Sequence, residues 1–257
     1  MSKFRAFLIH LTISATVVGT VFAIIFFLWY PAPYFRVSGA NDIVRVLIGV
    51  DLVLGPVLTL VLFKSGKPRL FFDLSIIVVI QLTALIYGTN VIFQERPYFV
   101  VFAVDRFVVV PKKDVDLTQI KYEVLKEKPW RGPILAFASL PEDNKEREKL
   151  MMDVISGAPD IDRRPEFWAP YAEKIDQVIA RAESLANIKP RSDEAKRQMA
   201  GVRARHENAD QLLFLPIMSN VNVYTMILDP ETRKVVDIVA VDPWEEARPA
   251  SPDESVG

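Results

Sequence analysis

The chain has 257 residues, of which 51% are hydrophobic and 25% charged, and its formal net charge is −1. These averages combine two different parts: the first 96 residues contain eight basic and four acidic residues, whereas the rest contains 23 basic and 28 acidic residues. The absence of cysteine excludes a disulfide scaffold, a thiolate zinc site and a cysteine nucleophile, and neither part has the dense basic stripe of a nucleic-acid-binding protein.

Three apolar runs in the first part predict transmembrane helices at residues 8–30, 43–63 and 74–93. A run of about 20 apolar residues is long enough to cross a hydrocarbon core of about 30 Å. A cleaved signal peptide is the alternative for the first run. That run is too long for the apolar region of a signal peptide, and the aromatic segment Trp29-Tyr30-Pro31-Ala32-Pro33-Tyr34 that follows it is typical of a membrane interface. We therefore expect an uncleaved anchor.

Basic residues predict the orientation of these helices. The N-terminal tail and the connection between the second and third helices contain five Lys and Arg residues, whereas the connection between the first and second contains only Arg36, with Arg45 just inside the helix. Because Lys and Arg favour the cytoplasmic side, we expect a cytoplasmic N-terminus. After three crossings the chain beyond Arg96 lies outside, which in a bacterium places the protein in the inner membrane with a periplasmic domain.

The remaining chain predicts an α+β domain at residues 97–244, with a mainly antiparallel sheet, and a disordered tail at residues 245–257. Expected strands are 99–110, 133–140, 212–218, 221–228 and 234–241, and expected helices are 142–155, 170–188 and 193–207. The first strand is interrupted by Asp105-Arg106. The turn sequence at residues 229–232 predicts that the last two strands form an antiparallel hairpin.

Asp51 is the most informative residue of the apolar part, because a carboxylate inside a membrane helix costs about 2.5–3.5 kcal/mol and requires a partner. Gly55 and Pro56 follow one turn later, and the proline ring should kink the helix and remove the hydrogen bond to the Leu52 carbonyl. On the third helix Gln81 or Thr83 could reach Asp51. We expect these residues either to hold the bundle together or to contact a polar group on another membrane helix. A proton relay is a weaker alternative.

Small residues are expected to allow close approach of the helices. Ala15, Gly19 and Ala23 form a stripe on the first helix, and Ala84 and Gly88 share a face of the third with Gln81. Such stripes let membrane helices pack tightly and let polar side chains bond across the seam.

The sequence does not predict an enzyme, and we expect no catalytic residue, metal or cofactor. His10 and His206 are the only histidines and are predicted on opposite sides of the membrane, and no glycine-rich phosphate loop is present. Asp105 and Asp242 could gather carboxylates for acid–base chemistry. Adjacent strand residues point to opposite sides, however, so a structural role is favoured in which Arg106 pairs with a nearby carboxylate.

Aromatic residues of the extramembrane part offer a candidate interaction surface. Trp168 and Tyr171 lie in a segment rich in aromatics and prolines, which either plugs the domain core or forms an exposed binding ledge. Together with Asp105, Arg106 and Trp244 they make up the periplasmic surface that we expect to contact a partner.

Several segments together are similar to a known family. They are Tyr30-Pro31-Ala32-Pro33, residues 49–56 (GVDLVLGP), 64–67, Phe72-Asp73-Leu74, Gln81, Tyr87-Gly88, Arg96-Pro97 and Asp105-Arg106-Phe107, with a looser match through Trp168-Ala169-Pro170-Tyr171 to Pro243-Trp244. They resemble the TfpX/TfpZ (FimB-like) type IV pilin accessory proteins. The resemblance implies an inner-membrane protein, without known catalytic residues, that assists the assembly or surface display of a type IV pilin.

We therefore expect a non-enzymatic accessory or chaperone protein of type IV pilus assembly. In this hypothesis the three-helix bundle receives the transmembrane helix of the major pilin, and the periplasmic domain contacts its head. The lipid bilayer and the pilus assembly machinery are further partners. The alternatives are a membrane-anchored pilin-modifying enzyme, with a substrate pocket near Asp105 and Asp242, and a periplasmic ligand-sensing domain.

Overall fold

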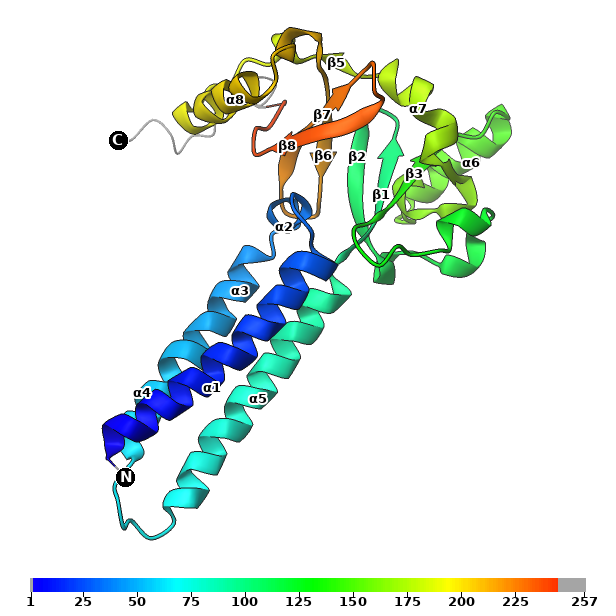
Figure 1. Ribbon diagram of the computed structural model, residues 1–257. Helices are drawn as coiled ribbons and strands as arrows, with labels where there is room; N and C mark the ends of the chain where they lie inside the picture. The colour runs from blue at the N-terminus through cyan, green and yellow to red at the C-terminus, as the bar shows by residue number, and fades with distance from the viewer. Residues whose placement is uncertain (1, 245–257) are drawn as a thin grey trace, which may run out of the picture. The chain divides into compact units, whose positions relative to one another are not determined.

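The computed structural model describes residues 2–244, so the tail predicted at residues 245–257 lies outside the described residues. The chain divides into two units (Figure 1). The helical unit contains the chain up to Arg96 and the short segment Trp130–Gly132, and the α/β unit contains the chain from Pro97 onward except for that segment.

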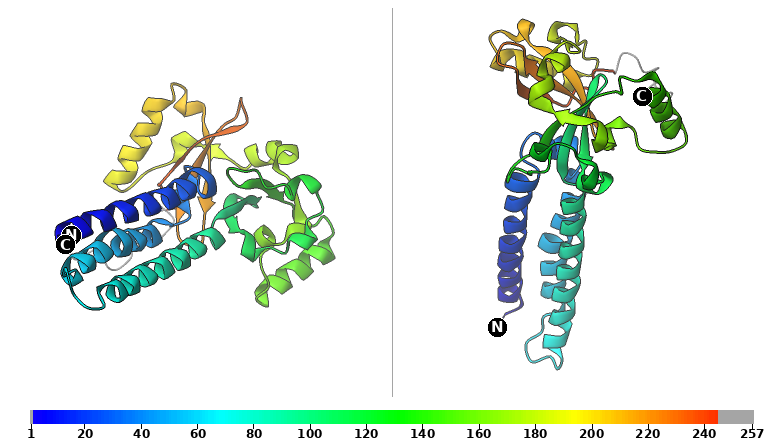
Figure 2. Two further views of the ribbon diagram at one scale, coloured as in Figure 1. Left: turned by 60° about the horizontal axis from the view of Figure 1, so that its bottom comes forward. Right: turned by 90° about the vertical axis from the view of Figure 1, so that its right-hand side faces the viewer.

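Three long helical segments make up the helical unit. They are α1 (Lys3–Ile24) with a π-helical extension (Ile25–Trp29), then α3 (Asn41–Ile48), a π-helical segment (Gly49–Leu54) and α4 (Gly55–Leu62) in one continuous rod, and α5 (Leu70–Gln94); the short α2 (Tyr34–Val37) connects the first two. All three segments are long and apolar enough to cross a membrane, which confirms the three predicted helices. In the right-hand view of Figure 2, α4 lies partly behind α5, and it packs against both α1 and α5.

The core of the helical unit lies where the first and third helices end. Ile25, Leu47 and Ile92 are almost completely buried there, and the Tyr30 hydroxyl donates a hydrogen bond to the Ile92 carbonyl at 2.7 Å. Elsewhere in the unit many apolar side chains point outward, and Ile86, for example, is 67% exposed. An exposed apolar surface of this extent marks a site of contact with other apolar groups.

Of the two predicted stripes of small residues, one packs against another helix and the other does not. Gly88 on α5 lies against the Leu47 side chain, and a Cβ at Gly88 would lie 2.7 Å from a Leu47 methyl group, so close packing at this position is confirmed. Ala15, Gly19 and Ala23 are exposed, so the expectation that this stripe packs inside the unit is wrong. Larger side chains of α1, including Val18 and Ile25, fill the interior instead.

The α/β unit contains one mixed sheet with the strand order β4-β3-β1-β2-β6-β7-β8, and β5 pairs with β6. The strands are β1 (Pro97–Ala103), β2 (Arg106–Pro111), β3 (Ile134–Ala138), β4 (Trp168–Pro170), β5 (Glu183–Ser184), β6 (Leu213–Met218), β7 (Val223–Asp229) and β8 (Lys234–Val239). Because β1 pairs with β3 in parallel and β2 pairs with β6 in parallel, the expected mainly antiparallel sheet is wrong. The hairpin of the last two strands is confirmed.

The single strand expected at residues 99–110 is in fact the hairpin of β1 and β2. Val104 adopts a positive φ of 61° at the turn, and the Asp105 N–H donates to the Ala103 carbonyl at 2.7 Å. Splitting this run gives the sheet two central strands in place of one. The later strands β3 and β6 then pair in parallel with one member each.

Three helices flank the sheet: α6 (Asn144–Ile155), α7 (Tyr171–Ile179) and α8 (Asp193–Arg205). Asp143 and Ser192 accept hydrogen bonds from the first-turn N–H groups of α6 and α8 and so cap them. The helix expected at residues 170–188 ends nine residues early. Glu183 and Ser184 pair there with β6, and Leu185 is 1% exposed, so sheet pairing and burial outweigh the helical periodicity.

Candidate functional site

The π-helical segment around Asp51 leaves one main-chain carbonyl without a donor from its own helix. In this register the Gly55 N–H donates to the Val50 carbonyl, five residues back. The next residue, Pro56, has no N–H to offer to the Asp51 carbonyl. The sequence predicted this loss at the Leu52 carbonyl, four residues before Pro56; in the π-helical register the Asp51 carbonyl, five residues before it, also lacks this donor. Such π-helical turns are frequent at functional sites.

Gln81 of α5 provides the missing donor. Its side-chain Nε2 lies 3.2 Å from the Asp51 carbonyl oxygen and 3.4 Å from Asp51 Oδ1. The amide fits there because Gly55 has no side chain: a Cβ at Gly55 would overlap the Gln81 amide. The predicted pairing of Asp51 with Gln81 is therefore present, and Gly55 and Pro56 each have a definite part in it.

Two acceptor atoms of this pair have no hydrogen-bond partner within the described residues. They are Asp51 Oδ2 and Gln81 Oε1, and the two side chains belong to residues that are only 3% and 8% exposed. A buried polar atom without a partner costs about 1–3 kcal/mol. Both atoms can accept a hydrogen bond, and residues 2–244 supply no donor to either of them.

A second polar contact joins α1 to α4. His10 Nδ1 and Thr59 Oγ1 lie 2.6 Å apart and form a hydrogen bond, and Thr59 is 3% exposed. Sequence reasoning did not select Thr59. The signal was its spacing: it follows Asp51 by eight residues, which is about two helical turns and brings it back to the same face.

These polar residues line a cavity of about 280 Å³ between α1 and α5, which we call the groove. Its walls are apolar and include Ile9, Ile13 and Val17 of α1 and Leu74, Val78 and Leu82 of α5. Asp51, Gln81, His10, Thr59 and Ser14 provide its polar atoms. The groove is thus an apolar surface with a small number of acceptors, which is the usual composition of a site that orients an apolar ligand.

Thr83 lies outside this group. It is exposed, and its hydroxyl donates to the Val79 carbonyl of its own helix at 2.8 Å. Gln81 and Leu85 face the interior of the unit, and Thr83, two residues after Gln81, points away from it.

The five residues expected at the periplasmic surface do not form one patch. Trp168 is 1% exposed and donates its indole N–H to the Ile161 carbonyl at 3.0 Å, so it plugs the core. The Tyr171 ring packs against Phe107, with ring centres 6.0 Å apart. Asp105 and Arg106 bond to each other through two contacts of 2.7 and 3.2 Å, because they lie at the hairpin turn. Arg106 also lies over the Trp244 ring, 4.8 Å from its centre.

A second cavity of about 220 Å³ lies beside this pair, in the α/β unit. Asp105, Glu183 and Asp242 line it together with Arg181, Lys189 and Trp244. The pocket that the enzyme alternative requires near Asp105 and Asp242 therefore exists. Among residues 2–244, no group of three or more His, Asp or Glu residues is placed to hold a metal ion.

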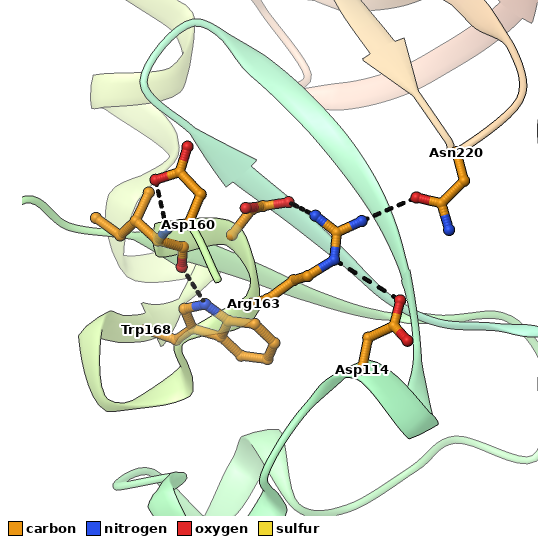
Figure 3. A network of polar contacts seen from close by, with 7 residues as sticks. Asp114, Asp160, Arg163, Trp168 and Asn220 are labelled. Carbon is orange, nitrogen blue, oxygen red and sulfur yellow. Dashed lines mark hydrogen bonds and ion pairs between the residues drawn. The ribbon is translucent and has the colours of Figure 1, made fainter. Parts of the chain in front are cut away.

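A polar network of the α/β unit, which sequence reasoning did not find, centres on Arg163 (Figure 3). Its guanidinium donates to Asp162 Oδ2 at 2.8 Å and to Asn220 Oδ1 at 2.9 Å, and it lies 3.7 Å from Asp114 Oδ2. Burial raises the pKa of the Asp162 carboxyl, and the neighbouring Arg163 offsets part of this rise. The network joins three separate segments, so its role is to fix their positions.

Comparison with known proteins identifies the family. The family model "Fimbrial assembly protein FimB" matches residues 1–39. The chain is 29% identical over 243 residues to the fimbrial assembly protein of serogroup I from Dichelobacter nodosus and 28% identical to that of serogroup E1, with 92% of this chain and 94% of each relative covered. It is 37% identical over 114 residues to the protein of serogroups C1 and C2, which covers 44% of this chain and 87% of that relative. No solved structure matches. The resemblance seen in the sequence is confirmed, and the chain belongs to the FimB family of fimbrial assembly proteins.

Proposed function

We propose that this protein assists fimbrial assembly by holding the apolar helix of a fimbrial subunit, a type IV pilin, along the groove between α1 and α5. The observation that carries this proposal is the pair of buried acceptors, Asp51 Oδ2 and Gln81 Oε1, that lack a partner inside an apolar groove. The apolar side chains of such a helix pack against the apolar walls of the groove. A hydrogen-bond donor of the helix at this depth bonds to the two acceptors.

The groove is large enough to receive side chains of a second helix. A volume of about 280 Å³ corresponds to several aliphatic side chains, so the partner helix packs its side chains into the groove while its main chain remains outside. Van der Waals packing and interhelical hydrogen bonds drive association of membrane helices. A polar contact there contributes about 0.6–2 kcal/mol, and it also fixes the register of the partner helix.

In this proposal the three helices cross the inner membrane with the N-terminus in the cytoplasm. The distribution of basic residues supports that orientation. The α/β unit then lies in the periplasm, where it contacts the globular head of the subunit whose helix occupies the groove. The protein acts as a chaperone and not as an enzyme, in agreement with the names of its relatives as fimbrial assembly proteins.

The test is the variant Asp51→Leu. Because Gln81 also bonds to the main-chain carbonyl of residue 51, this variant removes the carboxylate and keeps one contact between the helices. We expect normal abundance of the variant but less co-purified subunit per molecule. Thr83→Leu, on the outward face, is the matched control and should change neither quantity. A fall in abundance with unchanged capture per molecule would show that Asp51 serves only the stability of the bundle.

The pocket beside Asp105 and Asp242 supports a second candidate, a membrane-anchored enzyme that modifies the subunit. Its lining includes the carboxylates of Asp105, Glu183 and Asp242. Acid–base chemistry requires such groups within hydrogen-bonding distance of the substrate. The two functions differ in one measurable result, since only the enzyme changes the mass of the subunit.

A further inference from the structure

The chain enters the helical unit a second time, through the segment Trp130–Gly132. Residues on both sides of this segment belong to the α/β unit. Gly132 turns the chain with a positive φ of 79°, which glycine adopts without strain, and the position of a Cβ at Gly132 is 3.9 Å from the Pro31 ring. The segment therefore lies beside the residues that directly follow the first helix.

Interfacial residues already gather at this end of the helices. The Trp29 and Phe93 rings are in contact, with centres 4.8 Å apart. The Arg96 guanidinium lies 3.6 Å from the centre of the Phe93 ring and donates to the Phe93 carbonyl at 2.6 Å. Trp and Arg at the end of an apolar helix are typical of the boundary between hydrocarbon and headgroups.

The Trp130 side chain is exposed at this same end of the helices. Trp130 is 80% exposed, although its indole ring is one of the largest apolar surfaces in the chain, and Arg131 beside it is also exposed. An indole ring with a basic neighbour such as Arg131 suits the headgroup layer, because the ring prefers the boundary between apolar and aqueous phases and cations are attracted to lipid phosphates.

We propose that Trp130 and Arg131 form a lipid-binding finger that enters the headgroup layer of the leaflet in which the first and third helices end. Trp130 lies at the boundary with the acyl chains, and Arg131 contacts lipid phosphates. The finger attaches this second passage of the chain through the helical unit to the same leaflet. This inference requires the helices to span the bilayer, and it does not depend on what occupies the groove.

The absence of cysteine makes the test direct. Single-cysteine variants of the full chain are labelled with an environment-sensitive fluorophore and reconstituted into liposomes of phosphatidylethanolamine and phosphatidylglycerol. Trp130→Cys is compared with Ile155→Cys in the α/β unit, which is 76% exposed, and with Ile86→Cys on α5. Each sample is quenched in turn by iodide in the buffer, by a nitroxide on the lipid headgroup and by a nitroxide deep in the acyl chains.

We expect the label at position 130 to be quenched most strongly by the headgroup nitroxide, and the label at 155 mainly by iodide. The label at 86 should respond to the acyl-chain nitroxide. Arg131→Glu in the Trp130→Cys background should reduce quenching by the headgroup nitroxide. The proposal is wrong if position 130 behaves like position 155, which would place it in water, or if it is shielded from all three quenchers, which would mean that protein covers it.

Discussion

The Gln81 side chain donates a hydrogen bond to the main-chain carbonyl of Asp51, at 3.2 Å. This carbonyl is the one that the π-helical register and Pro56 leave without a donor in its own helix. The same carboxamide and the Asp51 carboxylate then present two unpartnered acceptors, Gln81 Oε1 and Asp51 Oδ2. A local defect of one helix thus both joins two helices and creates the polar part of the groove.

Replacing Gln81 with leucine should destabilise the helical unit. The variant keeps the side-chain volume approximately but leaves the buried Asp51 carbonyl without a donor, which costs about 1–3 kcal/mol. Unfolding of the purified protein in detergent, followed by circular dichroism, measures the change. Thr83→Val is the matched control, because Thr83 bonds only to its own helix and is exposed. Equal losses of stability in the two variants would show that the hydrogen bond from Gln81 to the Asp51 carbonyl does not stabilise the helical unit.

Pro56→Ala should reduce the cost of Gln81→Leu. Alanine at position 56 restores an N–H that can reach the Asp51 carbonyl within the helix, so the carbonyl no longer depends on Gln81. A double-mutant cycle of Pro56→Ala and Gln81→Leu measures this coupling, which we expect at about 0.5–3 kcal/mol for residues that share one network. Strictly additive effects would show that the two residues act independently.

Gly55→Ala should be more harmful than Gly19→Ala. A Cβ at Gly55 overlaps the Gln81 amide, whereas no atom lies within 4 Å of a Cβ at Gly19. We expect overpacking at Gly55 to cost about 1–3 kcal/mol, and Gly19→Ala to stabilise α1 by up to about 1 kcal/mol through its better helix propensity. Thermal unfolding of both variants in the same detergent checks the order. If Gly55→Ala unfolds at a higher temperature than Gly19→Ala, the Gln81 side chain moves away from position 55 without a cost in stability.

Asp162 should make the α/β unit more stable as the pH falls toward 4. Burial raises the pKa of its carboxyl in the folded state, so its contribution is fully present below the unfolded pKa of about 4 and is lost as the pH rises through the folded pKa. Asp162→Asn cannot titrate. Denaturant unfolding from pH 7 to pH 4 should therefore show the wild type gaining stability relative to the variant. A relative loss would mean that Arg163 dominates and lowers the pKa of the carboxyl.

The double variant Asp105→Ala, Asp242→Ala separates the chaperone from the enzyme. If the protein is a chaperone, the intact mass of the fimbrial subunit is the same in cells that contain the wild type, the double variant or neither. Mass spectrometry of the purified subunit measures this. A mass difference that appears with the wild type and disappears with the double variant would establish the enzyme.

The sequence predicted the polar pair because a carboxylate in an apolar helix requires a partner. Asp51 and Gln81 were identified on that basis, and Gly55 and Pro56 were included because of their position. The π-helical register was not predictable, since it depends on how Gly55 and Pro56 fit against α5. Thr83 and Gln81 had similar depths, and only the rotation of α5 about its axis separates them.

The sequence predicted most helices and strands of the α/β unit and the hairpin of β7 and β8, but not the pairing of the other strands. The hairpin of β1 and β2 was missed because Val104, a β-branched residue, adopts the positive φ at its turn, where glycine or asparagine is the usual signal. Without that turn the parallel pairings of β3 and β6 could not be foreseen. The Arg163 network joins residues up to 57 positions apart, and no local pattern marks such a contact.

The most direct test of the groove is photo-crosslinking in the membrane of living cells. A photoreactive amino acid is placed at Ile13 or Val78, which line the groove without belonging to the polar pair, and at Ile86, which is 67% exposed and does not line it. We expect the fimbrial subunit to be captured from positions 13 and 78 and not from position 86. Capture from position 86 alone, or no capture from either groove position while the subunit still co-purifies, would contradict docking in the groove.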